Sequence, residues 1–155
     1  KTIIISKADL LQHWLGHRTL TRKTIEKFPD EELFKFSIGG MRTFADLAKE
    51  MLSLAVPGLS GIVNNRIDTY SHDLPLYSKA ELLEQWDKDT PLLIELYNQI
   101  PEERLNDDFN LFGEYNFPSV HNIIYFIDNE IHHRAQGFVY LRALGIEPPF
   151  FWDRE

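Results

Sequence analysis

Apolar residues recur at three- and four-residue spacing along four long segments, and this pattern constrains the fold more than any other feature of the chain. The segments lie near residues 7–28, 43–64, 79–100 and 119–144. Such spacing gathers apolar side chains on one side of a helix, and that side must pack against another element. The sequence therefore predicts an all-α fold, a four-helix bundle of the antiparallel type.

Capping residues mark where these helices begin and end. Ser6 opens a near capping box with Asp9, and Ser78 opens a capping box with Glu81. Ser119 is expected to cap the last helix, and Gly145 is expected to end it. Three of the four predicted segments therefore have start signals that are independent of their apolar pattern.

Two prolines and two irregular segments complete the prediction. Pro57 is expected to kink or end the second helix, whereas the third helix is expected to bend at Pro91 and continue. Residues 101–117 form a long aromatic loop, part of which can fold as a short hairpin. The apolar tail, residues 148–152, is expected to pack back on the helices.

Length and composition exclude several classes of protein. The chain has 155 residues, so residues 1–155 are expected to form a single domain. Its net charge of −8 argues against DNA or RNA binding, which needs a basic face. Without cysteine there is no thiolate metal site and no cysteine nucleophile, which is compatible with a cytoplasmic location. No apolar run approaches the length of about 18 residues that crosses a membrane, so no membrane partner is expected.

The segment from Asn129 to Gln136 carries the most informative polar residues. On a helix, Asn129 and His133 are one turn apart and face the same way, and such a pair can chelate a metal. His132 lies about 100° further round and cannot easily join them. The alternative is that one histidine of this segment is exposed and the other is hydrogen-bonded in the core.

Glu50 is the second unusual residue, because it lies on or beside the apolar stripe of its helix. A buried carboxylate is costly unless it is paired or coordinated. Its alternatives to a metal are a salt bridge to Arg134 or Arg18, or a position at the edge of the stripe. His13 and His17 also have one-turn spacing, and His17 is interpreted as a structural residue rather than a ligand.

These motifs resemble a known family. The string from Asn129 to Gln136, followed by Leu141-Arg142 and by Gly145-Ile146-Glu147-Pro148-Pro149, resembles the DinB-like (DinB/YfiT) four-helix-bundle superfamily. The segment Thr43–Met51 resembles the other marker of that family. The order of helices also fits, so the resemblance covers nearly the whole chain.

The resemblance implies a metal site. Members typically hold a divalent metal with three histidines, and the matching positions here are Glu50, Asn129 and His133. Two positions therefore offer oxygen ligands in place of imidazoles. The expected ion is nickel, zinc, iron or manganese, bound more weakly than by three imidazoles and with positions left open for water and substrate.

The resemblance also implies a chemistry and partners. Characterised relatives resemble S-transferases that use a low-molecular-weight thiol of the bacillithiol type, so the implied substrates are a small-molecule thiol and an electrophile. Arg134 or Arg42 is expected to hold a carboxylate of the thiol or substrate, and Tyr140 is expected to contact the substrate. Relatives are often dimers, so a homodimer is expected.

A non-catalytic function stays open beside this one. In a binding or stress-related bundle, the Asn129 amide can donate to the Glu50 carboxylate and accept from the His133 imidazole. The three residues would then form a structural hydrogen-bond network without a metal.

Overall fold

Four long helices dominate the computed structural model, which describes residues 2–155. These helices are α1 (Lys7–Lys27), α3 (Phe44–Asn64), α4 (Lys79–Gln99) and α5 (Ser119–Ala143). The shorter elements are α2 (Asp30–Lys35), a 3-10 helix η1 (Glu102–Asn106), and the strands β1 (Asp108–Leu111) and β2 (Tyr115–Pro118). The mostly helical fold that the apolar spacing predicts is confirmed.

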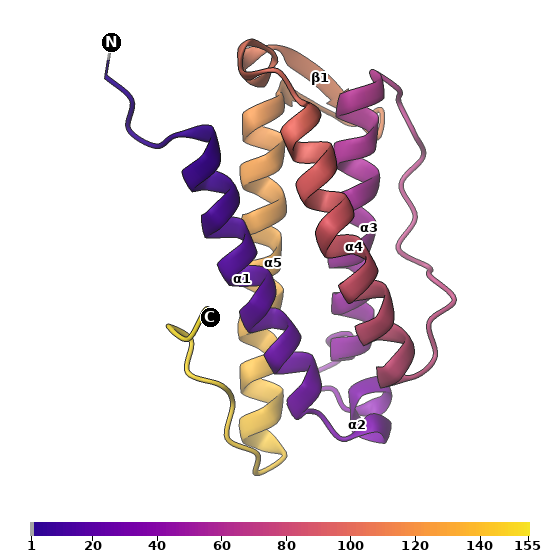
Figure 1. The fold of residues 1–155 in the computed structure, drawn as a ribbon. Coiled ribbons are helices and arrows are strands. Elements are labelled where there is room, and N and C mark those ends of the chain that lie inside the picture. Colours follow the sequence, from indigo (N-terminus) through magenta and orange to yellow (C-terminus); the bar gives the residue numbers. More distant parts are fainter. Residues whose placement is uncertain (1) are drawn as a thin grey trace.

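The long helices lie side by side, with α1 and α3 each packed against both α4 and α5 (Figure 1). Two neighbouring pairs, α3 with α4 and α1 with α5, run in the same direction (Figure 1). The prediction of an antiparallel-type arrangement is therefore wrong for these pairs. The reason is the connection from α3 to α4, which runs the length of the molecule before the chain turns into α4 (Figure 1).

Side-chain caps begin three of the four long helices. Ser6, Thr43 and Ser78 accept hydrogen bonds from the backbone N–H groups of Asp9, Asp46 and Glu81. The predicted cap at Ser119 is wrong, because Pro118 occupies the cap position and makes no side-chain cap bond. Ser119 is instead the first residue of α5, directly after β2.

Neither internal proline ends its helix. Helix α3 continues through Pro57 to Asn64, and α4 continues through Pro91 to Gln99. The end of α3 is set by Asn65, which adopts a left-handed conformation with φ of 49°. Because proline has no N–H, Pro57 leaves the carbonyl of Ser53 without its usual helical donor.

The short elements α2, η1, β1 and β2 lie between the four predicted helices. Helix α2 is six residues long, too short for an apolar period to reveal it. The hairpin that residues 101–117 can form is present, with Phe109 opposite Phe117 in an antiparallel pair. Its turn contains Phe112 and Gly113, with φ of 55° and 77°.

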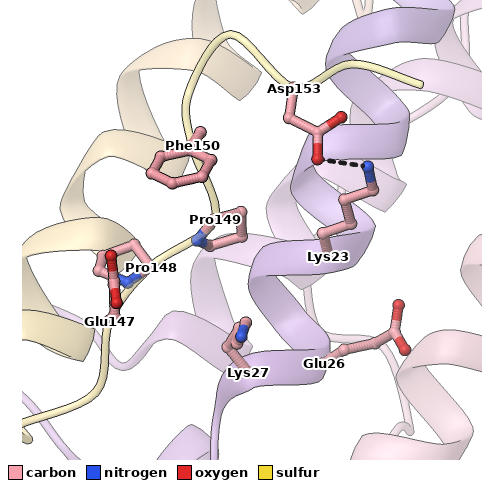
Figure 2. Close-up of a pocket in the computed structure, with 8 residues that line it drawn as sticks. All are labelled: Lys23, Glu26, Lys27, Glu147, Pro148, Pro149, Phe150 and Asp153. Carbon is pink, nitrogen blue, oxygen red and sulfur yellow. Dashed lines mark ion pairs between the residues drawn. The ribbon is translucent and has the colours of Figure 1, made fainter.

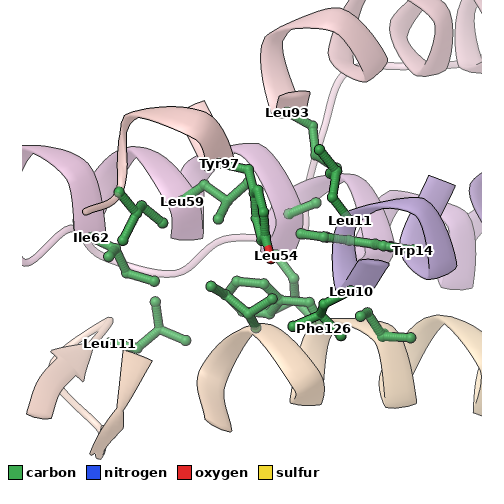
Figure 3. Close-up of a cluster of buried hydrophobic side chains, with 14 of the residues drawn as sticks. Leu10, Leu11, Trp14, Leu54, Leu59, Ile62, Leu93, Tyr97, Leu111 and Phe126 are labelled. Carbon is green, nitrogen blue, oxygen red and sulfur yellow. The ribbon is translucent and has the colours of Figure 1, made fainter. Parts of the chain in front are cut away.

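The core consists of two apolar clusters, one toward each end of the long helices. The cluster near the hairpin includes Trp14, Leu59 and Phe126 (Figure 3). The other includes Phe28, Phe44, Trp86 and Tyr140. Both clusters contain residues of α3 and α5. These helices approach closely because Gly137 has no Cβ, which would otherwise overlap the Phe44 ring.

The C-terminal tail returns along α1, but its aromatic side chains stay in solvent. Lys23 of α1 pairs with Asp153 at 3.0 Å, and Pro148 is buried (Figure 2). Phe150, Phe151 and Trp152 are 57%, 58% and 67% exposed. The expectation that the tail packs back is thus correct for its path and wrong for its rings, which stay exposed. Within residues 2–155, no helix is long and apolar enough to cross a membrane.

Candidate functional site

Glu50 of α3 meets Asn129 and His133 of α5, where these two helices face each other. The Glu50 Oε2 atom lies 2.6 Å from His133 Nε2 and accepts a hydrogen bond of 2.8 Å from Asn129 Nδ2. The side chains of Glu50 and His133 are 14% and 12% exposed. The convergence expected from one-turn spacing on α5 and from the inner position of Glu50 is therefore present.

Arg42 supplies the third partner of the carboxylate. Its Nη1 atom donates to Glu50 Oε1 at 2.8 Å from just before the start of α3. The salt bridges from Arg134 or Arg18 that were considered for Glu50 are not the ones formed. The sequence predicts that Arg42 contacts a ligand, and it does not predict this ion pair with Glu50. The two residues are only eight positions apart, and this short separation is the signal that could have suggested the pair.

The hydrogen bonds fix the protonation of this site. The His133 bond, followed by those from Asn129 and Arg42, holds the pKa of Glu50 well below its usual range. Glu50 is thus ionised, and the His133 Nε2 atom that faces it carries a proton. In a neutral imidazole this leaves a lone pair on Nδ1.

Two buried atoms of the site have no hydrogen-bond partner among the described residues, namely Asn129 Oδ1 and His133 Nδ1. The Asn129 oxygen can only accept a hydrogen bond, whereas the role of the His133 nitrogen depends on the protonation of the ring. Unpaired buried polar atoms are costly and call for a physical reason. A cation or a donor group supplied by a ligand would satisfy the Asn129 oxygen.

A small pocket opens beside Glu50 and Asn129. Its volume is about 110 Å³, and the rest of its wall is aromatic or aliphatic, formed by Leu54, Tyr70, Leu111, Phe112, Tyr115 and Tyr125. Burial, and then the charge of Glu50, raise the pKa of Tyr70, so that its phenol stays protonated. No sequence motif marks these aromatic residues as part of a site, because they come from the 66–77 connection, the hairpin and an exposed face of α5.

The side chains present fit a divalent cation by their chemistry. A carboxylate, an imidazole and an amide oxygen are ligands that zinc, nickel, iron and manganese accept. Asn129 Oδ1 has no partner at present, and Nδ2 faces Glu50. Rotating the amide by half a turn would place Oδ1 beside Glu50, because the two ends of an amide have nearly the same shape. Among residues 2–155, no three His, Cys, Asp or Glu side chains form a metal-binding group, so a metal here would need the Asn129 amide oxygen as its third protein ligand.

Arg134 and Tyr140 do not reach this pocket. Arg134 is 4% exposed and turns toward α1, where Nη1 donates to the His17 carbonyl at 3.1 Å. Tyr140 is fully buried and donates its hydroxyl to the Arg42 carbonyl at 2.7 Å. The structure therefore does not bring these two predicted substrate contacts to the site, although Tyr140 anchors the backbone of Arg42.

A second polar cluster occupies the opposite side of α5. Glu130 is 2% exposed and accepts a hydrogen bond of 2.6 Å from Thr21 of α1. Arg134 Nη2 lies 3.1 Å from His17 Nδ1. Burial, and then the charge of Arg134, lower the pKa of His17 to about 3, so His17 is neutral. This arrangement agrees with the interpretation of His17 as structural.

Comparisons with known proteins agree with this architecture. The model of the DinB family matches residues 5–153. The chain is 24% identical to the uncharacterized protein YjoA of Bacillus subtilis (strain 168), over 94% of this chain and 96% of that protein.

Two solved structures are similar in fold. A DinB-like protein from Bacillus cereus ATCC 10987 has a TM-score of 0.75 at 19% identity, covering 92% of this chain and 95% of that one. The DinB-like protein YjoA from Bacillus subtilis has a TM-score of 0.71 at 21% identity, covering 94% and 99%. With a family model that spans almost the full length, the chain belongs to the DinB family.

Proposed function

We propose that this chain is a four-helix-bundle enzyme that works on a small molecule with a divalent metal held by Glu50, Asn129 and His133. One observation carries the proposal: an ionised carboxylate and an amide with a free oxygen meet at the wall of a pocket, and the carboxylate also contacts the His133 imidazole. Nickel, zinc, iron and manganese suit this mixed set of ligands. When bound, such a metal would lower the pKa of a coordinated thiol or water.

The chain's own residues divide the remaining work. Glu50 supplies the negative charge, and Arg42 balances it from a half-exposed position. The aromatic wall formed by Tyr70, Phe112 and Tyr125 limits the access of water to a reacting group. Tyr140 holds the backbone of Arg42 and thus the geometry of its ion pair with Glu50.

The reaction class follows from the absence of cysteine together with the family resemblance. A sulfur nucleophile must come from a second substrate, because the chain has none of its own. We propose a low-molecular-weight thiol of the bacillithiol type. Its sulfur loses a proton to solvent and forms a bond to an electrophilic carbon, while the leaving group departs with the electron pair of the bond that breaks.

The second candidate function is a non-catalytic binding or stress-related protein. It is favoured by a specific observation, which is that the Glu50 carboxylate already has three partners without a metal. In this case the three residues form a structural network that joins α3 to α5.

Metal content and thermal stability separate the two functions. Purified protein is analysed for bound metal, and its melting temperature is measured with and without EDTA. A metal that binds only the folded state must raise that temperature. We expect His133→Ala to lose the metal and its stabilisation while keeping the helical circular dichroism spectrum.

His132→Ala is the matched control, because it removes an exposed imidazole from the adjacent position. It should retain the metal. Asn129→His should bind metal more tightly, since it restores the ligand that the family resemblance implies at that position. Full metal occupancy in His133→Ala, or no metal and no EDTA effect in the unsubstituted protein, would leave the structural network as the better account.

We also propose that the protein is a cytoplasmic homodimer that binds neither nucleic acid nor membranes. Exposed aromatic side chains on β2 and α5, Phe117 and Tyr125, offer an apolar contact. Sedimentation of the unsubstituted protein and of Phe117→Glu tests the dimer, which the added charge should weaken.

A further inference from the structure

We propose that a second, larger pocket binds an uncharged, mainly apolar small molecule that carries one hydrogen-bond donor, an N–H or O–H group. This pocket lies between α3, α4 and the connection that precedes α4, and it has a volume of about 450 Å³. Pockets that hold small ligands typically measure about 300–1,000 Å³. The inference does not depend on a metal at Glu50.

The walls of this pocket favour an apolar ligand. They come from four separate parts of the chain and are lined by Leu52, Val56, Pro57, Leu74, Pro75, Leu76, Leu92 and Phe112, among others. Leu92 is 40% exposed, so apolar surface faces solvent here. Burying such surface against an apolar molecule is favourable.

The polar atoms of the pocket favour a ligand that donates a hydrogen bond. Asp89 of α4 lines the pocket, is 6% exposed and accepts a hydrogen bond of 2.8 Å from Gln85. No lysine, arginine or histidine within residues 2–155 forms an ion pair with Asp89. Ser53 and Pro57 also line the pocket, and the carbonyl of Ser53 lacks the helical N–H donor that proline cannot supply.

Charge argues against an anionic ligand. The pocket lining contains Asp89 and no basic side chain, and the whole chain carries a net charge of −8. The positive charge of Arg18 acts on Asp89, but the Arg18 guanidinium donates its hydrogen bonds to the Trp86 carbonyl and the Thr90 hydroxyl. An anion would therefore enter without a partner for its charge.

Phe112 joins this pocket to the Glu50 site, because it lines both pockets. Its backbone has φ of 55°, an uncommon conformation for an aromatic residue and one that places it in the tight turn between β1 and β2. A molecule in the larger pocket would contact the other side of the wall that bounds Glu50. The apolar part of a ligand and its reacting part can thus be held in neighbouring compartments.

The fluorescent amine N-phenyl-1-naphthylamine tests this inference, because it is neutral and apolar and has one N–H donor. Its fluorescence rises when it leaves water, so a titration of the full chain gives a dissociation constant. We expect saturable binding with one site per chain. Val56→Trp fills the pocket from α3 and should weaken binding at least tenfold.

Val139→Trp is the matched control, since it makes the same substitution at an exposed position of α5. It should change the dissociation constant by less than twofold, as should Glu50→Gln, which removes the charge of the other site. Asp89→Leu should weaken binding roughly fivefold through the lost hydrogen bond. If Val56→Trp does not fold, Leu92→Trp blocks the pocket from α4.

No saturable binding, or binding that Val56→Trp and Leu92→Trp leave unchanged, would overturn the inference. Equal losses in Val56→Trp and Val139→Trp would do the same. Loss of binding in Glu50→Gln alone would place the probe at the smaller site and would also contradict the inference. None of these results depends on whether His133 binds a metal, so the two proposals fail separately.

Discussion

Helix α5 carries two polar pairs at one-turn spacing, and their surroundings differ. Asn129 and His133 face Glu50 of α3, whereas Glu130 and Arg134 face Thr21 and His17 of α1. Both regions place a carboxylate among nitrogen donors. Only the first carboxylate lines one of the pockets described above.

The unpartnered atoms are of opposite kinds in the two regions. Near Glu130 they are donors, Trp14 Nε1 and Arg18 Nη1. The Glu130 carboxylate can accept hydrogen bonds from both after small side-chain movements. At the α3 side they are the Asn129 oxygen, which can only accept, and His133 Nδ1, whose role depends on the protonation of the ring. An unpaired acceptor can bind a cation, whereas an unpaired donor cannot, so the Asn129 oxygen favours the α3 side as the candidate site.

The largest expected effect is on stability at the α1 side. Glu130→Ala removes the buried carboxyl group whose charge stabilises Arg18 and Arg134 and which accepts from Thr21, and this should cost about 3–5 kcal/mol in the free energy of unfolding. Asn129→Ala removes a neutral, partly exposed amide and should cost about 1 kcal/mol. Urea denaturation measures both, and equal costs would remove the distinction between the two regions.

We also expect the stability of the protein to depend on pH through His17, on the α1 side. The folded pKa of His17 is about 3 against an ordinary value of 6.5, so between these values the unfolded chain binds a proton that the folded chain excludes. Stability from this group is therefore complete above pH 6.5 and falls with decreasing pH toward 3, by up to about 1.4 kcal/mol per pH unit.

His17→Asn isolates this contribution, because Asn keeps an acceptor for Arg134 and does not titrate. The difference between the two stability profiles over this pH range cancels the other groups. Profiles that run parallel below pH 6.5 would show that His17 is protonated in the folded chain.

An intermediate effect should follow from separating α5 and α3. Gly137→Ala places a methyl group against the Phe44 ring and should cost about 1–3 kcal/mol, although alanine normally favours a helix. The same change at Gly16 meets only Arg154 in the tail, whose nearest atom is a side-chain carbon at 3.2 Å, and should be neutral or stabilising. Thermal unfolding compares the two, and metal retention should fall only in Gly137→Ala.

The smallest effect on stability is expected at Arg42. Its pair with Glu50 is half exposed on the arginine side, so Arg42→Gln should change stability by less than about 1 kcal/mol. It should nevertheless increase metal affinity, because it removes a cation that competes for the Glu50 oxygen. Isothermal titration with nickel or zinc measures this, and weaker binding would indicate that Arg42 organises the site rather than competing for it.

The sequence by itself determined the local features of this protein. Apolar spacing defined the four long helices, and the capping residues Ser6 and Ser78 placed two of their starts, since both signals act within one or two turns. One-turn spacing also selected Asn129 and His133, and the position of Glu50 on its helix selected the third residue of the site.

The tertiary structure alone decided which side chains meet. The partner of Glu50 is Arg42 rather than Arg134, and Arg134 instead turns to His17. Helices α3 and α4 run parallel because of the path of the long loop that connects them, and that loop also covers the larger pocket. The loop has no periodic pattern from which its path could be predicted. A helix's rotation and its neighbours follow from packing over the whole molecule, such as Gly137 against Phe44, and no short sequence window contains that information.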